Sequence, residues 1–237
     1  MPVFIKWFPS AWFHIRAKGK IIYVDPAYLS SYFTDYPKRI EFSKWPDPID
    51  GLPEELEEAD LILVTHHHKD HVKRVTVNRL LRPDTLVVAP KRCTKELGYD
   101  MKVIEPGEEI TLGAVKVKAV KAYNTEKGSS TRKVHHEGDG VGYLLTVESR
   151  TIYHAGDTDL IPEMKKLGPV DVALLPIGGT FTMNVREATE AVTAIKPKIA
   201  ISMHQLRADP YEFKKKVEAR TDTKVVVLKT GEIYRLG

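Results

Sequence analysis

Apolar and polar residues along the chain follow two periods, and together these predict a mixed α/β fold. Short apolar runs and strict alternation predict β-strands, whereas apolar residues three and four positions apart predict helices. We expect strands at 3–8, 12–16, 20–24, 61–64, 86–89, 102–104, 109–112, 114–122, 141–147, 151–154, 170–175, 198–202, 224–228 and 232–236, and helices at 54–59, 72–81, 160–167, 187–195 and 211–219. These elements occur in two similar successions, although the alternation alone indicates only mixed α/β.

One segment, 27–52, has no clear period. It is rich in aromatic residues, namely Tyr28, Tyr32, Phe33, Tyr36, Phe42 and Trp45. We interpret it as a long loop, and loops of this length in compact domains are usually functional. Three roles are open for it: a wall of the active site, a cover over a subunit interface, or a layer packed on the body of the protein.

A histidine cluster directly follows the apolar run 61–64. His66 and His68 are two positions apart, so in an extended segment they point the same way and can bind one metal ion. Asp70 and His71 follow where the chain turns, and Asp70 supplies the negative charge that a cation near a helix N-terminus needs. Imidazole and carboxylate together suit zinc, iron or manganese. The alternative is a histidine-rich surface loop without a ligand.

The pattern His-x-His-x-Asp-His after this strand resembles the metallo-β-lactamase superfamily. Three later motifs occur in the order of that superfamily's remaining ligands: His135 before Gly-Asp-Gly-Val-Gly-Tyr, Tyr-His-Ala-Gly-Asp157-Thr, and Ser-Met-His204. The stretches "YHAGDTD", "PIGGTFTM" and "KPKIAISMH" are similar to those of metal-dependent hydrolases related to ascorbate-6-phosphate lactonases. The resemblance implies a four-layer αββα sandwich of two related halves. Since no linker divides the chain, we expect one domain over residues 1–237.

The resemblance also implies a dinuclear centre with specific ligands. One ion would be held by His66, His68 and His135, and the other by Asp70, His71 and His204, with Asp157 as the bridge. His135 is preferred to its neighbour His136 because its distance to the Gly-Asp-Gly motif matches the family. Zinc is the expected metal, with manganese and iron as alternatives.

The same resemblance indicates hydrolysis. Relatives that carry out redox chemistry with iron tend to have Glu where this chain has His68. Two ions about 3.5–4 Å apart can lower the pKa of a water to about 7, and Asp70 or Asp157 would orient it as catalytic groups. Substrate contacts are expected from loops that carry Tyr123, Asn124, Lys133, Thr180 and Met183.

Other residues have two interpretations. In the resembled superfamily an Asp-Pro pair lies close to the metal site, so Asp25 is either a carboxylate that orients a ligand imidazole or part of a plain turn. His154 either supports the ligands or is merely packed, whereas His67 and His14 are expected not to bind metal. Relatives usually have Gly-His where this chain has Pro9-Ser10, so a histidine often found near the site is missing.

Composition limits the partners and the compartment. The chain has 237 residues, 42% of them hydrophobic, and a net charge of +4. Its basic residues are interspersed with acidic ones, which argues against a nucleic-acid partner, and no apolar run reaches the ~20 residues of a membrane helix. The single cysteine, Cys93, fits a cytoplasmic location. Abundant Lys, Arg and Glu, with Gln205 as the only glutamine, are typical of thermophile proteins.

We therefore expect a cytoplasmic metal-dependent hydrolase that acts on a small ester-like substrate, a lactone or a phosphodiester. The first alternative is a nuclease of the same superfamily, and the second is a metal-binding protein without turnover. Phospholipid cleavage stays open because of the aromatic residues in 27–52. The family suggests a homo-oligomer.

Overall fold

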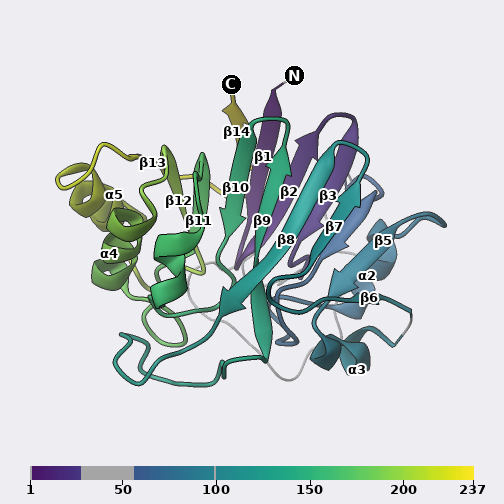
Figure 1. The fold of residues 1–237 in the computed structure, drawn as a ribbon, viewed down its shortest axis with the longest axis horizontal. Helices are drawn as coiled ribbons and strands as arrows, with labels where there is room; N and C mark the ends of the chain where they lie inside the picture. Colours follow the sequence, from purple (N-terminus) through teal and green to yellow (C-terminus); the bar gives the residue numbers. More distant parts are fainter. Residues whose placement is uncertain (1, 28–55, 99) are drawn as a thin grey trace. The chain divides into compact units, whose positions relative to one another are not determined.

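The computed structural model describes residues 2–27, 56–98 and 100–237. They form two compact units: unit 1 comprises Met1–Ile104 and Lys229–Gly237, and unit 2 comprises Glu105–Leu228. Each unit contains one seven-stranded sheet (Figure 1). Most of the predicted aromatic loop, residues 28–55, lies outside the described residues, so the interpretation of that loop stays a prediction.

The sheet of unit 1 has the strand order β14-β1-β2-β3-β4-β5-β6. Its strands are β1 (Val3–Phe8), β2 (Trp12–Ala17), β3 (Lys20–Val24), β4 (Leu61–Leu63), β5 (Leu86–Ala89), β6 (Lys102–Val103) and β14 (Ile233–Leu236). The C-terminal strand β14 thus pairs with the N-terminal strand β1, and the two are antiparallel.

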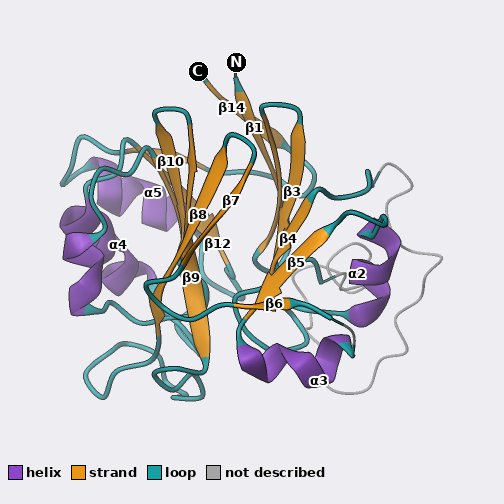
Figure 2. Cartoon of the chain, turned by 45° about the vertical axis from the view of Figure 1, so that its right-hand side comes forward, coloured by secondary structure: helices purple, strands orange, loops and turns teal. Residues whose placement is uncertain are grey.

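Helices cover one face of this sheet: α2 (Arg74–Leu80) and α3 (Thr94–Leu97), the latter preceded by the 3₁₀ turn η2 (Lys91–Cys93) (Figure 2). Val77 and Leu80 of α2 belong to one buried cluster with Trp12, Tyr23 and Ile62 of the strands. Burial of apolar side chains of this size contributes about 1.5–3 kcal/mol each, so this cluster fixes the strand ends against the helices.

Unit 2 repeats the arrangement with the order β13-β12-β11-β10-β9-β8-β7. Its strands are β7 (Glu109–Leu112), β8 (Val115–Ala122), β9 (Gly140–Val147), β10 (Arg150–His154), β11 (Val172–Pro176), β12 (Ile199–Met203) and β13 (Lys224–Val226). The 3₁₀ helix η3 (Pro162–Lys166) precedes β11, and α4 (Val185–Ile195) and α5 (Pro210–Glu218) lie on one face of this sheet (Figure 2).

Both sheets have the same pairing pattern. Read from β14, the first three pairs of unit 1 are antiparallel and the next three are parallel. Read from β7, unit 2 has the same succession. The carboxyl ends of parallel strands share one edge of a sheet, where α/β proteins commonly place their sites. His66 follows β4, Asp157 follows β10 and His204 follows β12, so these residues leave such edges in their own units.

A few predicted elements differ from the structure. The described part of the expected helix 54–59, residues 56–59, is not helical, because its backbone is used elsewhere: the Ala59 amide donates to Leu80 O. The expected helix 160–167 is the shorter 3₁₀ helix Pro162–Lys166. Helix α3 was not predicted, since four residues are too few for a period. None of the described helices is long and apolar enough to cross a membrane.

Candidate metal centre

In unit 1 the candidate ligands lie in the turn after β4. His66 Nε2 is 3.0 Å from His68 Nδ1, so these two side chains converge as their spacing predicts. The backbone then reverses, because the amides of His71 and Val72 both donate to His68 O, at 2.9 and 3.0 Å. The turn brings His71 beside His66, with ring centroids 4.1 Å apart, and places His71 Nε2 3.7 Å from Asp70 Oδ2.

Asp25 holds this turn in place through hydrogen bonds. It follows β3 and is fully buried. Its Oδ1 accepts a hydrogen bond from the Thr65 amide at 2.7 Å, and its Oδ2 lies 2.7 Å from both Thr65 Oγ1 and His71 Nδ1. A carboxylate on Nδ1 fixes the tautomer that leaves Nε2 as a metal ligand. Of the two interpretations, the structure therefore favours the orienting carboxylate over the plain turn.

Thr65 is a supporting residue that the sequence analysis missed. Besides its two bonds to Asp25, its hydroxyl lies 3.0 Å from His66 Nδ1. One buried hydroxyl thus contacts both the orienting carboxylate and a candidate ligand ring. Its position between the apolar strand and the first histidine was the only signal in the sequence.

In unit 2 two imidazoles converge on one carboxylate oxygen. Asp157 Oδ2 is 3.4 Å from His135 Nε2 and 3.2 Å from His204 Nε2, and all three side chains are buried. Gly156 adopts φ +65°, which favours glycine, and its amide donates to His154 Nδ1 at 3.2 Å. His154 thus supports the turn that presents Asp157.

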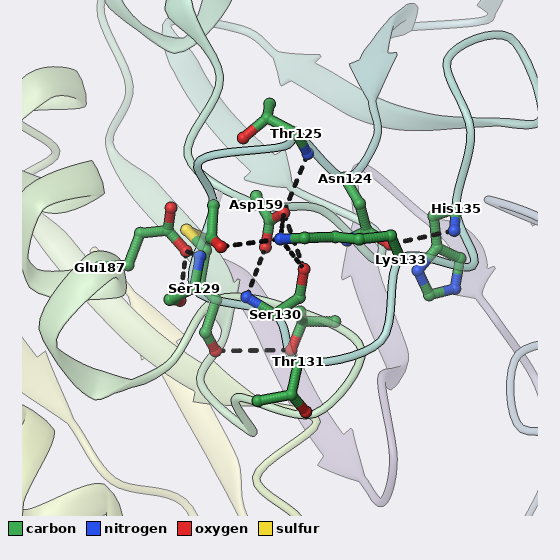
Figure 3. Close-up of polar contacts among 12 residues, drawn as sticks. Asn124, Thr125, Ser129, Ser130, Thr131, Lys133, His135, Asp159 and Glu187 are labelled. Atoms are coloured by element: carbon green, nitrogen blue, oxygen red, sulfur yellow. Dashed lines mark hydrogen bonds and ion pairs between the residues drawn. The ribbon is translucent and has the colours of Figure 1, made fainter.

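Asn124 positions His135. The side-chain Oδ1 of Asn124 accepts from the backbone amide of His135 at 3.0 Å, and the backbone amide of Asn124 donates to His135 O at 2.7 Å (Figure 3). The His135 Nδ1 lies 3.2 Å from Phe181 O, which leaves Nε2 directed at Asp157. The neighbouring His136 is exposed. Asn124, expected among the substrate contacts, thus serves the ligand loop, and Met183 is fully buried.

The donor sets in each unit suit a transition-metal ion. Two ligand atoms that are each about 2.0 Å from a tetrahedral zinc lie about 3.3 Å apart. The separation in the His66–His68 pair is 3.0 Å, and those of Asp157 from its two imidazoles are 3.4 and 3.2 Å. Imidazole nitrogens and carboxylate oxygens are also the ligands that zinc, manganese and iron accept.

His14 lies outside these groups, as expected. Its ring stacks on Tyr23 with centroids 4.7 Å apart. Burial, together with the charges of Arg16 and Lys6, lowers the pKa of His14 to about 4.

The chain is similar to proteins of a known family. A family model described as "Beta-lactamase superfamily domain" matches residues 4–204. A UPF0173 metal-dependent hydrolase of Methanopyrus kandleri is 33% identical over 242 residues, which cover 97% of this chain and 98% of that protein. Another, from Pyrococcus furiosus, is 40% identical over 195 residues, 78% of this chain and 84% of the relative.

Solved structures show the same fold. A protein of Parabacteroides distasonis has a TM-score of 0.79 at 30% identity and covers 95% of this chain and 92% of its own. Igni18, a metallo hydrolase from the hyperthermophilic archaeon Ignicoccus hospitalis, has a TM-score of 0.76 at 26% identity. The match covers 100% of this chain and 99% of Igni18. The predicted fold class, a metallo-β-lactamase fold with two related halves, is confirmed.

Proposed function

Because the chain belongs to the β-lactamase superfamily and, within it, to the UPF0173 metal-dependent hydrolases, we propose that it uses two divalent metal ions to hydrolyse a small ester-like substrate in the cytoplasm. The substrate is a lactone or a phosphodiester. The observation that carries the proposal is Asp157, whose Oδ2 faces the Nε2 atoms of two imidazoles at ligand–ligand distances.

Each unit contributes part of the proposed ligand set. Unit 1 supplies His66, His68, Asp70 and His71, and unit 2 supplies His135, Asp157 and His204. In the proposal His66, His68 and His135 would hold one ion, Asp70, His71 and His204 would hold the other, and Asp157 would be the ligand shared by both. Zinc is the expected metal for this donor set.

The two ions, when bound, would supply a Lewis acid and lower the pKa of water into the neutral range. The residues of the chain orient the reactants. The carboxylates of Asp70 and Asp157 accept hydrogen bonds from the attacking water and so direct its lone pair at the ester. The contact between His71 Nδ1 and Asp25 Oδ2 orients the imidazole ring, so that Nε2 is the atom available to a metal ion. No serine or cysteine nucleophile is required.

Metal content and turnover in three variants test the proposal. We expect the wild type to contain about two metal ions per chain and to hydrolyse bis(p-nitrophenyl) phosphate or a member of a lactone panel. Asp157→Ala and His68→Ala should lose metal and at least about 100-fold of kcat, because each removes a ligand. His136→Ala, which removes the exposed neighbour of His135, is the matched control and should behave as wild type.

Four outcomes would count against the proposal. Turnover in metal-free protein would exclude the metal centre, and equal activity in wild type and Asp157→Ala would exclude the ligand assignment. Bound metal without turnover on any ester would favour a metal-binding protein. A steep loss of substrate affinity with rising salt would favour a nuclease.

A further inference from the structure

The loop 123–136, which carries His135, folds around a buried carboxylate. Asp159 is fully buried and accepts four hydrogen bonds from this loop (Figure 3). Its Oδ1 accepts from the Ser130 amide at 3.1 Å. Its Oδ2 accepts from the Thr125 amide at 2.9 Å, the Ser130 hydroxyl at 2.7 Å and Lys133 Nζ at 3.0 Å. The loop therefore has a polar core in place of an apolar one.

This polar core requires hydrogen-bond acceptors at both terminal atoms of residue 159. An ionised carboxylate only accepts hydrogen bonds, and every group that faces Asp159 here is a donor. Lys133 brings the compensating positive charge and also donates to Gly128 O at 2.7 Å. An asparagine at position 159 would turn an NH₂ group toward at least one donor and lose the charge pair. Since burying an unmatched polar group is costly, the loop conformation depends on the acid.

Gly128 shows how closely the loop approaches this acid. A Cβ atom added at Gly128 would lie 2.1 Å from Asp159 Oδ2 and 2.2 Å from its Cγ. Both atoms belong to a fully buried side chain that cannot move aside without breaking its hydrogen bonds. Glycine is therefore required for this contact.

The same network joins two candidate metal ligands. Asp159 is two residues after Asp157, and its amide donates to Tyr123 O at 3.0 Å. Thr158 Oγ1 donates to the same carbonyl at 3.0 Å. At the other end of the loop, Lys133 is two residues before His135. The turn that presents Asp157 and the loop that presents His135 are thus bound to each other near both ends of segment 123–136.

We propose that Asp159 is a positioning residue of the metal centre, which holds His135 at its distance from Asp157 before a metal binds. The inference rests on the proposed function. Its reason is preorganisation: the long loop between β8 and β9 has no regular structure and would otherwise have to become ordered when the ion binds, and this ordering weakens binding. Asp159 itself does not touch the ion or the substrate.

Asp159→Asn tests this role against a matched control. Asp171 is also a buried carboxylate of unit 2, and it accepts from the Thr151 amide and Lys198 Nζ, both at 2.8 Å. It lies where β10 and β11 begin, at the end of these strands opposite to the one that Asp157 follows. Both substitutions should lower the melting temperature. Only Asp159→Asn should weaken Zn²⁺ binding, by roughly 10- to 100-fold, and change the visible absorption spectrum of the Co²⁺-substituted protein. Zn²⁺ affinity is measured by competition with a chelator.

A second variant covers the case in which Asp159→Asn does not fold. Ser130→Ala removes a single donor to Asp159 Oδ2 and should weaken Zn²⁺ binding by a few fold. Unchanged Zn²⁺ affinity and an unchanged Co²⁺ spectrum in a variant at 159 or 130 would overturn the positioning role, as would an equal effect of Asp171→Asn. A wild type that binds no Zn²⁺ would instead overturn the proposed function, and this inference with it.

Discussion

Among single residues, Asp25 is the one on which the ligands of unit 1 most depend. It is buried, it adopts φ +51°, and its carboxylate lies 2.7 Å from His71 Nδ1. The residue could be selected from the sequence because the resembled superfamily has an Asp-Pro pair, like Asp25-Pro26, close to its metal site. The role could not be separated from a plain turn until the contact with Thr65 was known, since that contact joins residues 40 positions apart.

We expect Asp25→Asn to weaken metal binding by roughly 10- to 100-fold, because the amide can turn an NH₂ toward His71 Nδ1 and favour the wrong tautomer. Elemental analysis after dialysis against a weak chelator measures the loss. Asp60→Asn is the control, because Asp60 is a buried carboxylate at the opposite end of β4. Full metal content in Asp25→Asn, or equal loss in both variants, would contradict the orienting role.

At the scale of elements, helix ends show where the chain departs from ideal local geometry. Helix α3 ends at Gly98 with φ +70°, a conformation that costs glycine little. Helix α4 ends in the same conformation at Lys196, with φ +56° and ψ +51°, and the Lys196 amide donates to Val192 O at 2.7 Å. A side chain with a Cβ atom is strained there by about 1–2 kcal/mol.

Lys196→Gly should therefore stabilise the protein by about 1 kcal/mol, because it removes this strain and keeps the capping hydrogen bond. The free energy of unfolding in urea measures the gain. Lys196→Ala keeps the Cβ atom while it removes the charge, so it should give no gain. Equal stability of the Gly and Ala variants would show that the left-handed geometry is not the cause.

Strands were predicted more accurately than helices, for a physical reason. The bounds of β1, β3, β5 and β7 match the predicted ranges to the residue, because a short apolar or alternating run of four to six positions marks a strand directly. Helix α3 and the 3₁₀ helix η3 are too short to show a period. The ligand types were likewise visible in the sequence, whereas the network around Asp159 was not, since loop contacts leave no period.

At the scale of the whole molecule, the two units repeat a buried acid at the entry to equivalent strands. Asp60 precedes β4, and its Oδ2 accepts from the Ile21 amide at 2.8 Å. Asp171 precedes β11, and its Oδ2 accepts from the Thr151 amide at 2.8 Å. The backbone amide of Asp60 donates in turn to Ile21 O at 2.8 Å, and that of Asp171 donates to Thr151 O at 2.9 Å. The relation between the halves, predicted from the order of elements, thus extends to individual hydrogen bonds.

Both acids are held ionised by basic neighbours. Burial raises the pKa of Asp60, but the hydrogen bond and charge of Lys20, 2.7 Å away, together with the Ile21 amide and the charge of Arg82, outweigh it and keep the pKa below its ordinary value. Burial likewise opposes ionisation of Asp171, and Lys198 at 2.8 Å lowers its pKa. A folded-state pKa below the unfolded value contributes stability that is present above the unfolded pKa and is lost as the pH falls through the folded-state pKa.

Asp60→Asn and Asp171→Asn should each cost about 1.5–3 kcal/mol at pH 7, because a charged acceptor is removed from buried donors. Below about pH 4 the wild type loses the same stabilisation, so the difference between wild type and each variant should shrink there. Urea unfolding at pH 7, 5 and 3.5 measures the difference in the free energy of unfolding. The control is Asp84→Asn at an exposed position, which should stay within about 0.5 kcal/mol of wild type. If the difference in the free energy of unfolding stays constant down to pH 3.5, packing and not charge accounts for the stabilisation by these two acids, which occupy equivalent positions in the two halves.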